Sequence, residues 1–283
     1  MAFGTLATRK NARLRLAISG TAGAGKTYSA LLLAKEFGSK IGVMDSERGS
    51  ASKYAGAAGI PPFFVEELEE KNVQEYLTKI KEAAEAGIDA LVIDSYSHSW
   101  LCALEAVDKM GGSKFSNGWK VVSPLVSKLV DAVLSYPGHV IATMRSKADY
   151  VVETDAKTGK SVPRKVGLAT VARDGTDYEF DVMIDLTPEG GLSISKTRCS
   201  ALNGQTYSRE DVPKIGKTLK AWLSEGAPLT AVDAMKERIR SASSEQLAAL
   251  VDEIKALPAE DRAKLKDAYA ARKKHLAGEA DAE

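Results

Sequence analysis

The sequence is poor in several features that mark particular classes of protein. It has two cysteines, Cys102 and Cys199, whose separation matches neither a disulfide framework nor a metal-binding spacing. It has no run of about 18 apolar residues, so no segment is expected to span a membrane. The first ten residues lack an apolar signal core. We therefore expect a protein of a reducing cytoplasm with no membrane partner.

An excess of charge of one sign is also missing. The formal net charge is +1, while charged residues make up 27% of the chain and apolar residues 44%. This balance is ordinary for a globular protein and provides no overall basic field for nucleic acid. Any nucleic-acid site must come from a local patch. The 283 residues suffice for one sizeable core and an appendage.

A glycine-rich segment is the clearest feature that is present. Residues 20–27 fit the G-x-x-x-x-G-K-[ST] phosphate-binding loop, between a strand expected at 14–18 and a helix expected at 26–37. Glycines let backbone N–H groups turn toward phosphates, and the positive end of the helix favours the same anions. The Lys26 amine can reach the β- and γ-phosphates, and the Thr27 hydroxyl can ligate Mg²⁺. The predicted nucleotide-binding residues are Gly20, Thr21, Ala22, Gly23, Ala24, Gly25, Lys26, Thr27 and Tyr28.

Strands and helices alternate over the first two thirds of the chain, which predicts an α/β fold with a mostly parallel, helix-covered central sheet. Gly38 is expected at the C-cap of the first helix. The further elements expected from periodicity are strands at 41–44, 90–93, 140–144, 178–186 and 192–195, and helices at 73–86 and 124–134. A polar-tipped β-hairpin extension is expected over 150–166.

The composition shifts near residues 226–228, which predicts an ATP-binding core of residues 1–226 and a C-terminal appendage of residues 227–283. The appendage is rich in Ala, Lys and Glu, with a candidate capping box at Ser243 and Gln246 and a second helix starting at Pro258. This pattern predicts a helical hairpin. A simple stabilising pair of helices is favoured over a docking or oligomerisation device.

Two of the predicted strands end in carboxylates. The strand that ends at Asp94 fits the Walker B element, in which the aspartate holds Mg²⁺ together with a hydroxyl such as that of Thr27. The earlier strand ends in Asp45-Ser-Glu47, where a carboxylate can polarise the attacking water. Glu47 is favoured because it lies further toward the C-terminal edge of the sheet, where such sheets bind ligands. A solvated strand end is the alternative.

These motifs, in this order, resemble the RecA/DnaB-type ATPase core, and within it phage-encoded RecA-like ATPases of recombination gene clusters. The resemblance covers about residues 12–224. It implies a RecA-like P-loop NTPase fold, ATP and Mg²⁺ as cofactors, single-stranded DNA as partner and a homo-oligomer, either ring or filament. A single-strand-binding protein or an annealase is a further partner that it implies. For a phage-encoded protein the compartment is the host cytoplasm.

The resemblance also assigns roles to individual residues. Residues 194–198 are similar to the finger that RecA-like subunits insert into a neighbouring ATP site, which implies that Lys196 and Arg198 act in trans. Residues 173–181 resemble a signature of the phage group. Arg145 stands where RecA-like proteins have a Gln or His sensor, and so departs from the pattern.

In the RecA-like layout two loops face the DNA. The first, residues 109–120, is rich in Gly and Ser and is expected to be mobile, and its aromatic rings beside cations suit base stacking. Anchoring of the aromatic rings to the core is an equal alternative. The second, residues 147–173, carries a run of cations, for which a solvated surface is the alternative. The predicted DNA-binding residues are Lys114, Phe115, Trp119, Lys120, Lys160, Arg164 and Lys165.

The function favoured by the sequence is an oligomeric, ATP-hydrolysing recombination protein that acts on single-stranded DNA in annealing or mediation. Its predicted catalytic residues are Lys26, Glu47, Asp94, Lys196 and Arg198. One alternative is a P-loop small-molecule kinase that uses residues 109–120 as a lid. Another is an ATP-dependent assembly factor of the helicase-loader type, against which Glu47 argues. A DNA-stimulated ATPase rate separates the first hypothesis from the kinase.

Overall fold

The computed structural model describes residues 12–110, 115–154, 161–187, 189–224 and 244–280, together with Val232, Met235 and Ile239. The chain divides into two compact units, one of Ala12–Glu225 and another that contains Gly226–Glu283. Within the ranges just given, no helix is both long and apolar enough to cross a membrane.

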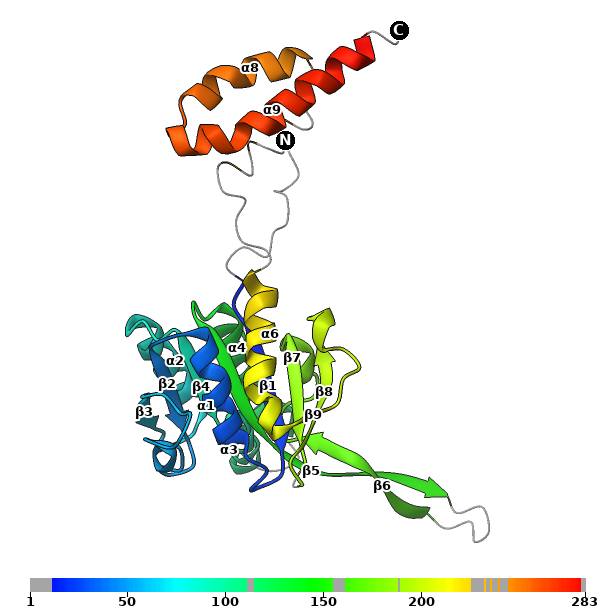
Figure 1. The fold of residues 1–283 in the computed structure, drawn as a ribbon. Coiled ribbons are helices and arrows are strands. Elements are labelled where there is room, and N and C mark those ends of the chain that lie inside the picture. The colour runs from blue at the N-terminus through cyan, green and yellow to red at the C-terminus, as the bar shows by residue number, and fades with distance from the viewer. Residues whose placement is uncertain are drawn as a thin grey trace. The chain divides into compact units, whose positions relative to one another are not determined.

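The first unit is built on one sheet in the order β3-β2-β4-β5-β1-β7-β8-β9, with β6 paired to β5 (Figure 1). The strands are β1 (Arg15–Gly20), β2 (Ile41–Asp45), β3 (Phe64–Glu67), β4 (Ala90–Asp94), β5 (His139–Thr154), β6 (Ser161–Thr170), β7 (Val182–Leu186), β8 (Gly191–Thr197) and β9 (Tyr207–Ser208). The six strands from β3 to β7 along this order are parallel, and β6, β8 and β9 pair antiparallel. The predicted α/β fold with a mostly parallel central sheet is therefore confirmed.

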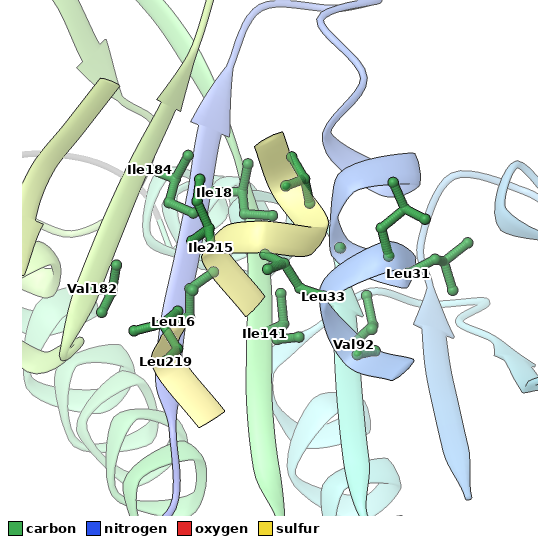
Figure 2. Packing of buried hydrophobic residues seen from close by; sticks show 14 of the residues in the cluster. Leu16, Ile18, Leu31, Leu33, Val92, Ile141, Val182, Ile184, Ile215 and Leu219 are labelled. Carbon is green, nitrogen blue, oxygen red and sulfur yellow. The ribbon is translucent and has the colours of Figure 1, made fainter. Parts of the chain in front are cut away.

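Helices cover both faces of this sheet, because side chains alternate between the faces along each strand. The helices are α1 (Lys26–Phe37), α2 (Val73–Glu85), α3 (Tyr96–Lys109), α4 (Phe115–Ser135), α5 (Thr176–Glu179) and α6 (Val212–Ser224). Leu16 and Ile18 of β1 pack in one buried cluster with α1 and α6, as Figure 2 shows. Ala17 belongs to the opposite cluster with α2, α3 and α4. Burial on both faces explains why these strands read as unbroken apolar runs.

Gly38 ends α1 at the predicted position, but for a different reason. Its backbone is extended, with φ of −170°, and not left-handed. A Cβ at this position would lie 2.2 Å from the Cβ of Asp89. The glycine is therefore required by the close approach of another segment and not by a turn.

The prediction of a mobile loop over residues 109–120 is wrong for residues 115–120, which form the start of α4. Residue 109 ends α3, a helix that the sequence pattern did not predict, and residues 111–114 lie outside the described ranges. A Cβ on Gly118 would lie 3.1 Å from Val107 of α3. This glycine thus permits two helices to approach, whereas its sequence context suggested a flexible loop.

The strand predicted at 178–186 begins later, at Val182. Residues 176–179 instead form the short helix α5 after Gly175, whose φ of 85° is left-handed. The Thr176 hydroxyl donates to the Arg173 carbonyl at 2.6 Å, which closes this turn. The Asp181 carboxylate accepts from the backbone N–H of Arg15 at 3.1 Å and ties the start of β7 to β1.

The described part of the C-terminal unit contains α8 (Ser244–Lys255) and α9 (Ala259–Ala280). Its buried cluster is formed by Val232, Met235, Ile239, Leu247, Leu250 and Leu265. Pro258 lies directly before α9, where the fixed φ of proline favours the first turn of a helix.

His139 is a buried structural histidine at the start of β5. Its Nδ1 accepts a hydrogen bond from the backbone N–H of Leu14 at 3.1 Å. Burial, and next the charges of Arg13 and Arg15, lower the pKa of His139 from its ordinary 6.5 to about 4. The neutral imidazole is therefore the form that the fold requires.

This burial predicts a specific loss of stability in acid. Below pH 6.5 the unfolded chain binds a proton at His139, while the folded chain does not until about pH 4. The contribution is full above this window and is lost as the pH falls through it. We expect His139→Gln to flatten the pH dependence of the free energy of unfolding by roughly 3 kcal/mol across the window. Urea unfolding at a series of pH values measures this, and an unchanged slope contradicts it.

Candidate active site

The glycine-rich loop lies between the C-terminal end of β1 and the first turn of α1. Gly23 and Gly25 have φ of 77° and 89°, a left-handed region that side chains disfavour. A Cβ on Gly20 would lie 2.9 Å from the carbonyl oxygen of Leu186. Each of the three glycines is thus required by local geometry. The N–H groups of the first turn of α1 face the same loop and favour anions there.

Lys26 lies over this loop. Its Nζ donates to the backbone carbonyl of Thr21 at 2.9 Å. Burial lowers the pKa of Lys26, although the carboxylates of Glu47 and Asp94 favour its charged form. The amine is therefore placed among opposite charges at the point where phosphates would enter.

The other predicted loop residues lie around the same turn. Ala24 is buried, and Thr21 and Ala22 lie on the loop itself. Tyr28 follows on α1 and packs its ring against Tyr54 with 5.8 Å between the ring centroids. The contact with Tyr54 thus holds the Tyr28 ring on one side of α1, next to the phosphate-binding turn.

The candidate Mg²⁺ ligands are in direct contact. The Thr27 hydroxyl donates to Oδ2 of Asp94 at 2.6 Å. The other oxygen of Asp94 accepts a hydrogen bond from the hydroxyl of Thr143 on β5. Burial raises the pKa of Asp94, and both hydroxyls oppose that rise. A hydroxyl and a carboxylate are oxygen donors of the kind that Mg²⁺ prefers beside a phosphate, so this pair fits the ion.

The two carboxylates after β2 have different surroundings. Asp45 is fully buried, and its oxygens accept from the backbone N–H groups of Glu47 at 2.6 Å and Ala51 at 2.8 Å. Asp45 therefore fixes the turn after the strand. The side chain of Glu47 is 29% exposed at the same edge of the sheet as the glycine loop. Of the two, Glu47 has the geometry to reach a water.

Arg145 pairs with this carboxylate. It lies opposite Gly20 in the β1–β5 register, and its Nη2 is 2.8 Å from Oε1 of Glu47. Burial alone would raise the pKa of Glu47, but the Arg145 contact, with His98 and Lys26 further off, holds that pKa below its ordinary value. A carboxylate held in this way is a weak base until the ion pair opens.

A second polar group supports the same edge. The hydroxyl of Ser46 lies 2.6 Å from Nδ1 of His98 and accepts from the backbone N–H of Ser95 at 2.8 Å. Burial and the charge of Arg145 lower the pKa of His98. Ser46, His98 and Ser95 therefore tie the ends of β2 and β4 together. No motif in the sequence signals the contact of His98 with Ser46.

A further cation comes from a distant part of the chain. Arg209 lies in the short turn Arg209–Asp211 after β9, and its Nη2 donates to the carbonyl of Ala24 at 2.9 Å. A Cβ on Gly25 would lie 3.1 Å from this guanidinium. Sequence reasoning missed Arg209, because no motif relates a residue 185 positions away to the glycine loop.

The predicted finger residues lie away from the glycine loop of their own chain. Lys196 is opposite Met183 in the β7–β8 register, whereas Leu186 is the β7 residue beside Gly20. Three residues of strand correspond to about 10 Å. The amine of Lys196 donates to backbone carbonyls of α5, and Arg198 pairs with Asp181 at 3.0 Å.

The predicted DNA-binding residues that the structure describes lie on two elements, α4 and β6. Lys114 and Lys160 lie outside the described residues, and Phe115 begins α4. Trp119 is partly buried, with its ring 5.7 Å from that of Trp100, and so anchors α4 on α3. Lys120 is exposed on α4. On β6, Arg164 and Lys165 pair in register with Val151 and Tyr150 of β5.

The Thr143 hydrogen bond predicts a measurable effect on Mg²⁺. We expect Thr143→Val to raise the Mg²⁺ concentration needed for half-maximal ATP turnover by about 10- to 100-fold, because Asp94 loses the group that orients it. A Mg²⁺ titration of turnover measures this. Thr218→Val on α6 is the matched control. Equal Mg²⁺ requirements in all three proteins would exclude an orienting role for Thr143.

Comparison with known proteins agrees with this geometry. A family model described as AAA domain matches residues 12–206, which is more than half of the chain. The match includes the glycine loop, the β2 and β4 carboxylates and Arg145, and it stops short of Arg209. No curated protein matches the chain. Proteins of this family in general bind ATP with Mg²⁺ and hydrolyse it. The chain therefore belongs to the AAA-domain family of P-loop ATPases.

Proposed function

We propose that this ATPase is an oligomeric, RecA-like recombination protein of phage type that acts on single-stranded DNA as an annealing or recombination mediator. ATP and Mg²⁺ bind at the glycine loop with Thr27 and Asp94. Glu47 activates the attacking water. The assembly is a ring or filament in the host cytoplasm, and a single-strand-binding protein or annealase is its further partner.

The observation that carries this proposal is the path of β5. Its first half lies between β1 and β4 in the centre of the sheet, and its second half pairs with β6 in the hairpin that extends beyond the sheet (Figure 1). Arg145, the partner of Glu47, lies on this strand between the two halves. A ligand that displaces the hairpin therefore displaces Arg145, and through the ion pair it acts on the water-activating carboxylate of Glu47. DNA on the hairpin is coupled to ATP turnover in this way.

The placement of Lys196 and Arg198 supports action in trans. Lys196 lies on β8 and Arg198 directly follows this strand. Both are near the end of β7 opposite the glycine loop, so they do not serve the ATP site of their own chain. Lys196 is partly exposed and Arg198 largely so, and each is held by backbone carbonyls or a carboxylate close to it. In an oligomer such cations stabilise the charge that develops on phosphate in a neighbouring site.

The kinase alternative loses support. It needs residues 109–120 as a lid over the substrate, but residues 115–120 belong to α4, where Gly118 and Trp119 pack against α3. The assembly-factor alternative does not require a water-activating carboxylate, so the position of Glu47 beside Lys26 favours hydrolysis over it.

The assignment of the base predicts different results for the two carboxylates after β2. Glu47→Gln is expected to keep ATP binding and lose turnover by on the order of a hundredfold or more, because only the water-activating group is removed. Asp45→Asn is expected to lower the melting temperature, because two backbone N–H groups lose an ionised acceptor. ATP affinity, steady-state turnover and thermal melts of both variants measure this. Wild-type turnover in Glu47→Gln would contradict the assignment.

The coupling of the hairpin to ATP predicts salt-dependent DNA binding and DNA-stimulated turnover. Changing Lys160, Arg164 and Lys165 together to Ala is expected to reduce the log–log salt slope of single-stranded DNA affinity by roughly 0.7 for each phosphate that the variant no longer neutralises. It is also expected to abolish stimulation of turnover by DNA.

Fluorescence anisotropy with labelled oligonucleotides across a salt series, together with ATPase assays, measures both effects. Changing Lys214, Lys217 and Lys220 of α6 together to Ala is the matched control, because it removes the same charge from another surface. Unchanged slope and stimulation in the hairpin variant would refute the DNA assignment.

A further inference from the structure

An open groove of about 600 Å³ runs between α8 and α9 in the C-terminal unit. Its floor includes Val251 and Ile254 of α8 and Ala263 and Tyr269 of α9. Volumes of this size are typical of binding pockets. All of the residues that line the groove belong to this unit.

The floor of the groove is an edge of the buried core of this unit. Leu250 belongs to that core, while the next residue, Val251, lines the groove. Ile254 and Tyr269 pack against the core from the groove side and are only partly buried. Within the described part of the unit, no side chain fills the groove. Apolar surface of this kind is stabilised when a partner covers it.

Three cations line the groove, namely Lys255 on α8 and Arg262 and Lys266 on α9. Among the described residues, no carboxylate lines it. This is not a consequence of composition, because residues 244–280 contain seven Lys or Arg and seven Asp or Glu. Lys264 on α9, which does not line the groove, is balanced by Glu260 at 2.9 Å and by Asp261 at 3.4 Å. Of the three cations that line the groove, Lys255 already has an interaction partner, so the charge argument rests on Arg262 and Lys266.

The spacing of the rim cations suits a helical ligand. Arg262 and Lys266 are four residues apart on α9 and so lie one turn apart on the same face, at a separation of about 6 Å. Carboxylates at positions i and i+4 of a ligand helix have the same separation. From residue 259 to residue 269 the groove follows α9 for about 15 Å, the length of a helix of about ten residues.

We propose that this groove binds a short, acidic, amphipathic helix of a partner protein. Apolar side chains at i, i+3 and i+4 of that helix lie on Val251, Ile254 and Ala263. Its flanking carboxylates pair with Arg262 and Lys266 on α9. This is the helix-in-groove mode of recognition, with charge fixing the orientation. Nucleic acid fits less well, because phosphates use the cations and a base can stack only on Tyr269, which leaves the aliphatic part of the floor uncovered.

The test uses the full chain and a displayed library of random peptides of about twelve residues. Selection on wild-type protein is followed by counter-selection on Arg262→Glu/Lys266→Glu, in which the rim charge is reversed. We expect the enriched peptides to carry apolar residues three or four apart with flanking Asp or Glu.

By fluorescence anisotropy, enriched peptides should bind the rim variant at least about tenfold more weakly than wild type. Ala263→Trp, which fills the groove without changing charge, should weaken binding similarly. Lys264→Glu/Lys273→Glu is the matched control of equal charge change outside the groove and should bind within about twofold of wild type. Thermal melts check that every variant is folded.

Several results would overturn the proposal. In the first, the selection enriches no peptide that binds wild type more tightly than the rim variant. In the second, it enriches peptides without acidic residues. The third such result is a loss of binding in the Lys264→Glu/Lys273→Glu control as large as that in the rim variant. If the rim variant instead loses single-stranded DNA affinity, the rim is a nucleic-acid site. If it changes the oligomeric state in sedimentation, the groove holds a second copy of the chain. Either result replaces the proposed partner helix.

Discussion

The candidate active site depends on the hydrogen bonds that the buried carboxylate of Asp94 accepts. Its two oxygens accept from Thr27 of α1 and Thr143 of β5, so one side chain joins the helix after the glycine loop to two neighbouring strands. Asp94 is 1% exposed, and an ionised carboxylate at that depth requires either these hydroxyls or a cation. The two hydroxyls therefore stabilise the carboxylate and, through it, the alignment of the strands. The same register places Asp45 beside Asp94 and Gly20 beside Arg145, which brings the whole site to one edge of the sheet.

The ion pair between Glu47 and Arg145 gives the site two demands that conflict. The pair neutralises a carboxylate next to the entry point for phosphates, which lowers the repulsion that an incoming nucleotide meets. In the proposed mechanism, it also occupies the Glu47 oxygen that polarises water. ATP binding and water activation would then favour different positions of Arg145, and the strand that carries Arg145 continues into the hairpin.

Local patterns were enough to predict the elements that lie in the centre of the sheet. Apolar runs located β1, β2 and β4, and the spacing of glycines with Lys26 located the loop, because these depend on neighbours in sequence. The errors concern contacts between distant residues. In the sequence alone, Gly118 indicates a loop. In the structure it lies where two helices meet, because Val107 of α3 packs against it. Arg209 reaches Ala24 from a segment without any motif, and Ser46 meets His98 only once two strand ends are adjacent. Such contacts are set by tertiary packing, which no single-sequence pattern encodes.

The continuity of β5 also limits how the chain can vary in length. Side chains alternate between faces along a strand, so Arg145 and Lys147 share one face. One residue inserted between Arg145 and Asp149 would leave the sheet and the ATP site intact but turn the two faces of the hairpin over. Two inserted residues would preserve the faces and move the hairpin outward by about 7 Å. Insertions and deletions here are therefore governed by parity, except where a bulge absorbs one residue, as it does in β6 opposite Asp149 and Tyr150.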